Sequence, residues 1–217
     1  MDDAWREVRR RAARVGWRAR LRVSQRRLVT PFAVAASELP THGRILDVGC
    51  GYGLLSGLLA LHAPARRLVG VDIDVAKVAR ARALFGDLAR FEAVDVDAGG
   101  ALPPADHAVI WDVLHHVADA DALLARVAAA LPPGGLLLVK ENDTEPPWKL
   151  TIAHAIERLA VPTGITLSAP VRFRSRVEWR AALRAAGFDV LRAEHLVARE
   201  GFFVPHSLFL ARVARAA

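Results

Sequence analysis

An acid and three glycines stand where an apolar segment gives way to a helical pattern, in the stretch RILDVGCGYGLLSGLLA (residues 44–60). Asp47 closes the apolar run, and Gly49, Gly51 and Gly53 follow at every second position. A glycine-rich turn at the carboxyl end of a strand is the usual ligand site of an open α/β sheet, because glycine lets the backbone approach a ligand closely. The stretch therefore predicts a binding loop.

Three classes of ligand compete for such a loop. A P-loop needs a Lys followed by Ser or Thr at a fixed spacing after its glycines, and no Lys or Ser follows these glycines at that spacing. A dinucleotide fingerprint needs its third glycine one residue later, and a carboxylate at the turn does not favour a pyrophosphate. A cationic ligand is favoured by that carboxylate.

Four more segments follow in order. VGVDID ends a second apolar run at Asp72, FEAVDVDA places Asp95 after a third, DHAVIWDVLHHVAD carries a fourth, and ALPPGGLLLVKEND a turn and a fifth. Together with DVGCGYG, these segments resemble the ordered motifs of class I S-adenosylmethionine-dependent methyltransferases, whose first motif is acid-x-Gly-x-Gly-x-Gly. The resemblance spans residues 43–143.

The resemblance implies S-adenosylmethionine as cofactor, with its sulfonium and ammonium cations and no phosphate. It implies that Asp72 accepts the ribose hydroxyls, that Asp95 lies near the adenine amino group, and that Asp47 helps to orient the methionine ammonium. Gly49 and Gly51 are expected to leave room for the cofactor. The full set of expected cofactor-binding residues is Asp47, Gly49, Gly51, Gly53, Asp72, Ile73, Asp95, Val96 and Asp112.

Candidates for the transfer step come from the segments after the fourth and fifth apolar runs. Methyl transfer from a sulfonium depends mainly on positioning, and a base is needed only if the acceptor loses a proton. His115, His116 and Glu141 are the candidates for that base, and each also has a purely structural interpretation. No Cys, His or carboxylate cluster has metal-ligand spacing, so no metal is predicted.

These residues must be positioned by alternating strands and helices, which predict an α/β fold with a doubly wound, mainly parallel, seven-stranded sheet of the Rossmann-like methyltransferase type. Asp74 is expected to cap a helix, and Cys50 to be a small buried side chain. Residues 1–38 are assigned to a basic helical arm and 39–217 to the methyltransferase domain, with 144–175 as a wall of the acceptor site. The expected strands are 44–48, 67–72, 89–95, 107–112, 135–140, 188–196 and 202–212, and the expected helices 30–38, 54–62, 75–85, 119–130, 148–160 and 176–186.

Composition limits the class of protein. The chain has 217 residues, of which 53% are hydrophobic, so it can bury a large core. No apolar run reaches the roughly 18 residues of a membrane span, and the arginine-rich start does not resemble a signal peptide. With a single cysteine, the chain is expected in a reducing cytoplasm.

The basic charge belongs to the amino-terminal arm. Residues 1–27 hold ten arginines and three acids, which accounts for the whole net charge of +7, whereas the remaining chain is neutral. Trp5, Val8 and Ala12 fall on one helical face. Three interpretations stay open: a cap over the cofactor cleft, association with an anionic membrane surface, and contact with RNA, which the neutral body disfavours.

These observations predict a methyltransferase that acts on a small or lipid-like apolar acceptor at O, N or C. A non-catalytic cofactor-binding partner protein and an RNA methyltransferase are the alternatives. WDVLHH lacks the Asn/Asp-Pro-Pro-Tyr/Phe loop typical of methylation at exocyclic nitrogen, which disfavours that subtype without excluding others. Because the body is neutral, nucleic acid is not the expected partner. The sequence specifies neither the acceptor nor an oligomeric state.

Overall fold

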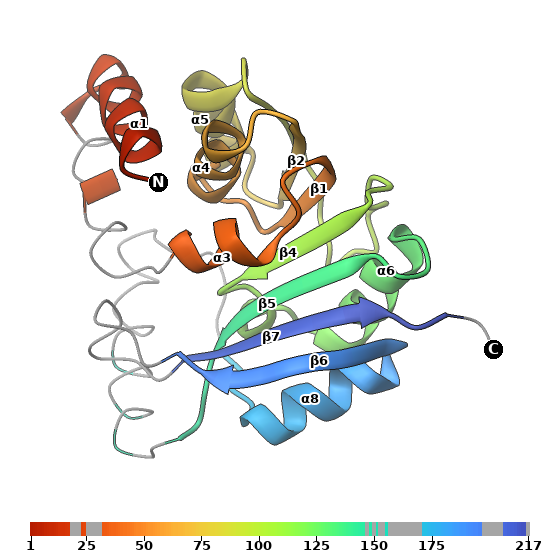
Figure 1. Cartoon of the computed structure of the whole chain (residues 1–217). Coiled ribbons are helices and arrows are strands. Elements are labelled where there is room, and N and C mark those ends of the chain that lie inside the picture. Colours follow the sequence, from red (N-terminus) through yellow and green to blue (C-terminus); the bar gives the residue numbers. More distant parts are fainter. Residues whose placement is uncertain are drawn as a thin grey trace.

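The computed structural model describes residues 1–17, 23–24, 32–145, 148, 151, 155, 171–196 and 206–215. A seven-stranded sheet with strand order β3-β2-β1-β4-β5-β7-β6 forms its centre, which confirms the predicted fold class (Figure 1). The strands are β1 (Gly43–Val48), β2 (Arg66–Asp72), β3 (Ala89–Ala93), β4 (His107–Trp111), β5 (Leu136–Asn142), β6 (Phe188–His195) and β7 (His206–Val213).

Five neighbouring strands, from β3 to β5, pair in parallel, whereas β7 pairs antiparallel with both β5 and β6. Parallel strands need crossover helices, which cover both faces of the sheet. This is why β1, β4 and β5 are apolar on both faces over most of their length, with Leu46 and Leu138 fully buried.

The helices cover the two faces of the sheet and create two separate cores. Side chains of α1, α3, α4 and α5 pack on one face, and those of α6 and α8 on the other (Figure 1). The helices are α1 (Asp2–Val15), α3 (Phe32–Glu38), α4 (Leu54–His62), α5 (Val75–Phe85), α6 (Ala120–Ala130) and α8 (Arg176–Ala185), with a 3₁₀ turn η1 at Leu114–His116.

Local sequence explains where several helices begin. Asp74 accepts hydrogen bonds from the N–H groups of Ala76 and Lys77, so the predicted cap of α5 is confirmed. Ser175 and Glu178 form a reciprocal capping box at the start of α8. These caps fix where the crossover helices leave the loops at the carboxyl ends of the strands.

Helix α1 packs into the main core. Trp5 and Val8 are 6% and 0% exposed, and the Trp5 ring lies 6.1 Å from that of Phe32. Arg11 adds a bidentate ion pair with Asp87, at 2.5 and 2.8 Å. The membrane interpretation of the arm therefore does not hold for the side chains of Trp5 and Val8, because the core covers them.

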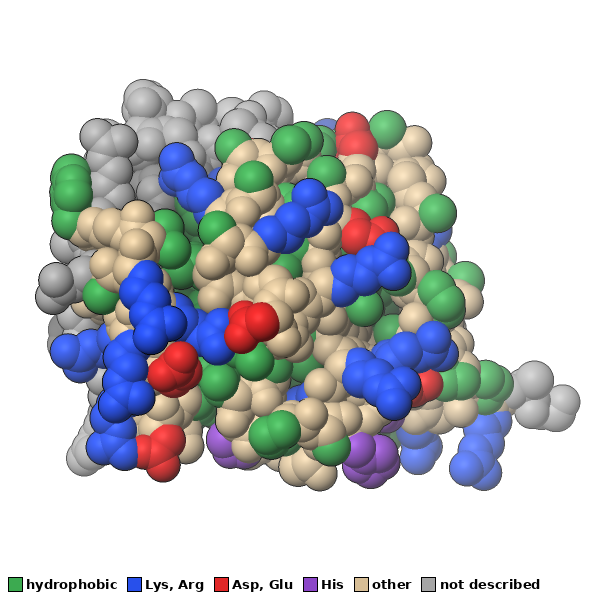
Figure 2. All heavy atoms as spheres, turned by 90° about the horizontal axis from the view of Figure 1, so that it is seen from above, with side chains coloured by type: hydrophobic (Ala, Val, Ile, Leu, Met, Phe, Trp, Pro, Cys, Tyr) green, Lys and Arg blue, Asp and Glu red, His purple; other side chains and the backbone are tan. Residues whose placement is uncertain are grey.

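The outer face of α1 is basic. Arg6, Arg9, Arg10 and Arg14 are exposed, although Arg6 pairs with Asp3 and Arg10 with Glu7. Figure 2 looks down on this end of the molecule and shows Lys and Arg side chains in several groups, some of them beside Asp or Glu. The core does not divide at residue 38, since α1 shares a cluster with Ile45 of β1.

Some predicted elements lie outside the described residues. These are the helix 148–160 apart from single positions, most of the segment 144–175, the first part of the strand 202–212, and much of the second half of the arm. Trp148, in the predicted acceptor wall, is described and is 61% exposed.

Candidate functional site

The sheet brings the predicted site residues to one edge. Because β1, β2, β4 and β5 are parallel, their carboxyl ends meet on the same side of the sheet. Asp72 ends β2, Asp112 follows β4, and Glu141 lies near the end of β5. The loop of residues 49–53 leaves β1 between them.

The surroundings of Gly49, Gly51 and Gly53 differ in whether a side chain would fit. All three have positive φ, and the N–H groups of Gly49 and Cys50 donate to the Val71 carbonyl at 2.8 and 3.0 Å. A Cβ at Gly49 would come within 2.3 Å of Val113, and one at Gly53 within 2.7 Å of Phe91, so both positions serve packing.

At Gly51 a Cβ would meet nothing within 4 Å. At Gly51 the direction of a side chain is therefore open, whereas at Gly49 it is taken by Val113. Contact of either glycine with the cofactor stays a prediction.

Asp72 is tied to the glycine loop. Its Oδ2 accepts the Gly51 N–H at 2.7 Å, and its Oδ1 accepts the Asp74 N–H at 2.9 Å. Each carboxylate oxygen can accept more than one hydrogen bond, so the pair of oxygens can still receive two hydroxyl groups. Ile73 beside it is 48% exposed and offers an apolar surface at the same edge.

Asp47 is buried beneath the loop at 2% exposure and accepts a hydrogen bond of 2.6 Å from Ser56 Oγ. Burial raises the pKa of this carboxyl group to about 6, and the nearby Asp72 charge adds to the rise. A cation at the loop would stabilise the ionised form of Asp47. The carboxylate would act through its field and the loop backbone, since its surface is covered.

Asp95 lies in a turn after β3. It is exposed, and its Oδ1 accepts the N–H groups of Asp97 and Ala98 at 2.9 Å each. Val96 is half-buried, and its carbonyl accepts a hydrogen bond from Arg126. The described contacts of Asp95 shape this turn, and contact with adenine stays a prediction.

Asp112 is the one described non-glycine residue with positive φ, at 58°. Its N–H donates to the Lys140 carbonyl at 2.9 Å, and its carboxylate accepts a hydrogen bond of 2.5 Å from Lys140 Nζ. Burial alone would raise the pKa of Asp112, but the charges of Lys140, His206 and His115 together hold it below its usual value. Asp112 is therefore ionised across the neutral range.

Glu141 holds the loop after β4 in place. Its Oε1 accepts the N–H groups of Val113 and Leu114 at 2.8 and 2.6 Å, and its Oε2 lies 2.5 Å from His115 Nδ1. Glu141 is fully buried, and His115 is 1% exposed. With both oxygens engaged inside the protein, Glu141 is placed to orient this loop.

His116 is the more accessible histidine of the pair. It is half-buried, and its ring centroid lies 4.1 Å from that of His115. The half-buried His116 thus packs against the buried pair of His115 and Glu141, at the carboxyl ends of the strands. Their roles in catalysis stay predictions.

Sequence reasoning missed Lys140 and His206. Lys140 is 1% exposed within β5, and its Nζ lies 3.3 Å from His206 Nε2. The signal was present in LLLVKEND, since a lysine inside an otherwise apolar strand must have a partner. His206 could not have been assigned, because only the antiparallel return of β7 brings it beside Asn142.

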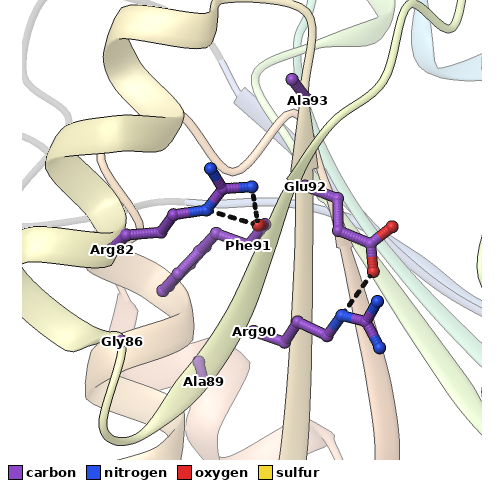
Figure 3. A pocket seen from close by; sticks show the side chains of 7 residues that line it. All are labelled: Arg82, Gly86, Ala89, Arg90, Phe91, Glu92 and Ala93. Carbon is purple, nitrogen blue, oxygen red and sulfur yellow. Dashed lines mark hydrogen bonds and ion pairs between the residues drawn. The ribbon is translucent and has the colours of Figure 1, made fainter.

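A separate hollow lies beside β3, the outermost strand of the sheet, between this strand and α5 (Figure 3). There Arg82 donates to the Phe91 carbonyl, and Arg90 pairs with Glu92 at 2.9 Å. Its described lining residues include none of the predicted cofactor-binding residues. The hollow is therefore distinct from the candidate site.

Two features are absent from the described residues. No group of three or more His, Cys, Asp or Glu side chains could hold a metal ion among them. Within the same part of the chain, no helix has both the length and the apolar character to cross a membrane. Cys50 is buried, as predicted, and burial raises the pKa of its thiol.

The comparisons with known proteins identify the family of this chain. Residues 17–193 match the family model described as "Methyltransferase domain", so the chain belongs to this methyltransferase family. It is a class I S-adenosylmethionine-dependent methyltransferase, and S-adenosylmethionine is its cofactor.

Among its relatives, trans-aconitate 2-methyltransferase of Methylobacterium nodulans is 33% identical over 77% of this chain and 67% of its own length. Ubiquinone biosynthesis O-methyltransferase of Xanthomonas axonopodis pv. citri is 32% identical over 60% of this chain and 57% of its own. The chain spans about half to two thirds of the curated relatives it matches.

Among solved structures, human N-acetylserotonin methyltransferase in complex with S-adenosylmethionine has a TM-score of 0.67. The match has 21% identity and covers 91% of this chain and 55% of that one. At this identity, the likeness establishes the fold.

The residues present fit the cofactor. Gly51 borders open space, Asp72 offers two oxygens beside it, and the buried Asp47 favours a cation. When bound, S-adenosylmethionine supplies an electrophilic methyl group on a sulfonium. Asp47, when ionised beneath the loop, would stabilise the positive charge of the cofactor's amino-acid end.

Proposed function

We propose that this protein transfers the methyl group of S-adenosylmethionine to an oxygen atom of a small-molecule acceptor. The observation that carries the proposal is the open cradle formed by Gly51 and Asp72, on the same sheet edge as the half-buried His116. The relatives support oxygen and a small acceptor, because their names specify trans-aconitate methylation and an O-methylation in ubiquinone biosynthesis.

The chain's own residues divide the work. Asp72 and the loop of residues 49–53 bind and orient the cofactor. Glu141 fixes the N–H groups of Val113 and Leu114 and so sets where the histidines lie. His116 receives the acceptor's proton if the attacking oxygen is a hydroxyl, whereas an acceptor carboxylate attacks already ionised and needs no base.

The two oxygen nucleophiles make distinguishable demands. A carboxylate such as that of trans-aconitate is ionised at neutral pH, so turnover would not require a group with a pKa near 7. A phenol or hydroxyquinone, such as a ubiquinone precursor, must lose its proton as it attacks. The pH profile of turnover therefore reports which class of acceptor the site serves.

The experiment is a turnover assay with methyl-labelled S-adenosylmethionine and purified full-length protein. The panel contains trans-aconitate, a prenylated phenol, a short saturated carboxylic acid and an RNA transcript. We expect transfer to one of the two oxygen-acceptor classes, with a methylated product identified by mass. Gly51→Val serves as the inactive control, since its side chain would enter the cradle.

Two outcomes would contradict the proposal. Labelling of the RNA alone would favour the RNA methyltransferase alternative. Cofactor binding by calorimetry without turnover on any panel member or on a small-molecule cell extract would favour the non-catalytic partner protein.

A further inference from the structure

A buried cation lies in the middle of the sheet. In β5, Lys140 follows a run of apolar residues, and it pairs in register with Trp111 of β4 and Leu208 of β7. It is 1% exposed. A buried ammonium is costly unless an anion and hydrogen-bond partners compensate it, so its contacts identify its role.

Lys140 contacts the residue that begins the loop after β4. Its Nζ donates to Asp112 Oδ1 at 2.5 Å, and His206 Nε2 lies 3.3 Å from the same Nζ. Asp112 contacts the Lys140 backbone as well, through its N–H. One residue of β5 thus holds both the backbone and the side chain of Asp112.

Asp112 needs this support. Its φ of 58° is in the left-handed region, which is unfavourable for a non-glycine residue and persists only where contacts impose it. The charged or titratable groups that face it are Lys140 from β5, His206 from β7 and His115 from η1. Among these, Lys140 makes the short hydrogen bond with its carboxylate.

The next residue of β5 holds the rest of the loop. Glu141 binds the N–H groups of Val113 and Leu114 and the ring of His115. Successive side chains of a strand point to opposite faces of the sheet. Lys140 and Glu141 therefore bind the loop from opposite faces. The segment 112–116 is thereby fixed along its length.

We propose that Lys140 is a positioning residue for methyl transfer: paired with Asp112 and next to His206, it holds the Asp112 carboxylate and the loop 112–116 in the geometry that the cofactor and acceptor meet. The inference rests on the proposed function, because it assigns this loop to the reaction site. Lys140 acts through Asp112 and does not itself contact the acceptor.

A double-mutant cycle tests whether Lys140 acts through Asp112. The four proteins are wild type, Lys140→Met, Asp112→Asn and the double variant, and the measurement is the affinity for S-adenosylhomocysteine by calorimetry from about pH 5.5 to about pH 8. We expect each single variant to bind on the order of tenfold more weakly. The double variant should be no weaker than the weaker single variant.

The pH dependence separates positioning from a purely structural role. Loss of the Lys140 charge raises the pKa of Asp112, which burial favours and which only His206 and His115 then oppose, so the Lys140→Met defect should grow as the pH falls. The double variant has no carboxylate at this position and should not show this growth. Asp47 titrates equally in all four proteins, so its contribution cancels in the comparison.

Two safeguards keep the test decisive. Lys140→Gln, which retains a hydrogen-bond donor, replaces Lys140→Met if the latter does not fold. Arg90→Met removes a cation that pairs with Glu92 at the outer edge of the sheet, and we expect it to bind like wild type.

The inference would be overturned if the double variant lost affinity by the product of the two single-variant factors. It would also be overturned if both Lys140 variants bound S-adenosylhomocysteine like wild type at every pH. Failure of wild type itself to bind would instead overturn the proposed function. The two failures are therefore distinguishable.

Discussion

The backbone N–H of Gly51 donates a hydrogen bond of 2.7 Å to the carboxylate of Asp72, so the glycine loop and the acid at the end of β2 form one unit. The residues are 21 positions apart, and the parallel pairing of β1 with β2 brings them together. A change in either residue therefore alters both the shape of the cradle and its hydrogen-bonding groups.

Gly51→Ala should separate backbone strain from loss of cofactor space. Positive φ costs alanine about 1 kcal/mol of stability, and the new Cβ would project into open space at the cradle. We expect affinity for S-adenosylhomocysteine to fall more than roughly tenfold. Gly134→Ala is the matched control, because Gly134 has φ of +84° and no neighbour within 4 Å but lies in the turn before β5. Equal affinity of the two variants would contradict the assignment.

Asp72→Ala should weaken binding of S-adenosylhomocysteine by about 1.5–3 kcal/mol, the range for hydrogen bonds to charged groups. The loss includes the anchor for the Gly51 N–H. Asp106→Ala is the control, since Asp106 also accepts a backbone N–H, from Arg44 at 2.7 Å, but precedes β4 at the opposite edge. Calorimetry on both variants decides, and unchanged affinity of Asp72→Ala would show that another group holds the ribose.

Asp47→Asn should stabilise the ligand-free protein at neutral pH while weakening cofactor binding. The folded-state pKa of about 6 lies above the ordinary value of 3.8. The folded state therefore binds more protons between these values, and stability falls as the pH rises from about 4 to about 6. Protonated Asp47 thus contributes on the order of 3 kcal/mol to the stability of the folded protein at low pH. This contribution is fully lost above about pH 6.

Denaturant unfolding at about pH 4 and about pH 8 measures this effect. Wild type should lose more stability than Asp47→Asn between the two values. Affinity of wild type for S-adenosylhomocysteine should also fall below about pH 6, as the carboxylate that favours the ligand's ammonium becomes protonated. Parallel stability curves for the two proteins would rule out a titrating Asp47.

His115 and His116 should differ in what their loss costs. His115→Ala leaves Glu141 without its ring partner and opens a cavity, so we expect about 2–4 kcal/mol of lost stability together with lower turnover. With a hydroxyl acceptor, His116→Ala should leave stability nearly unchanged and lower kcat by roughly a hundredfold, the scale of a general base, whereas turnover of a carboxylate acceptor should not need His116 as a base. The exposed His42 supplies the control substitution. Full turnover by His116→Ala would remove it as the base.

The fold was predictable because its signals are local and repeated. Apolar runs ending in Asp47 and Asp72, each followed by a helix start such as Asp74, specify strand and helix at once, and parallel crossovers then fix the order of the central strands. The antiparallel insertion of β7 between β5 and β6 has no such local signal. The sequence order of the last two strands does not reveal their order in the sheet.

Candidate site residues could be predicted where a local pattern, such as a strand end or a glycine turn, marks their place in the sequence. Asp72 and Gly51 each stand at a strand end or turn that the sequence marks. The partners of Lys140, Asp112 and Glu141 depend on which strands are neighbours and on a left-handed backbone at Asp112. Neither follows from residue spacing along the chain.

Association of the arm with an anionic membrane stays a prediction, and it should depend on charge rather than on Trp5, because Trp5 and Val8 are buried in the core. Deletion of residues 1–27 would remove that packing and is a poor test. Replacement of the exposed arginines by glutamine keeps the core, so stability should stay within about 1 kcal/mol of wild type. The replaced residues are Arg6, Arg9, Arg10 and Arg14.

We expect wild type to sediment with anionic phosphatidylglycerol vesicles at low salt and the four-glutamine variant to sediment much less. Each basic residue near an anionic surface contributes about 1 kcal/mol, and salt screens this attraction within a Debye length. Neutral phosphatidylcholine vesicles are the control and should sediment neither protein. Equal sedimentation of both proteins would exclude this face as the contact surface. Absence of sedimentation would leave α1 as a structural cap, held by Trp5 against Phe32 and by Arg11 against Asp87.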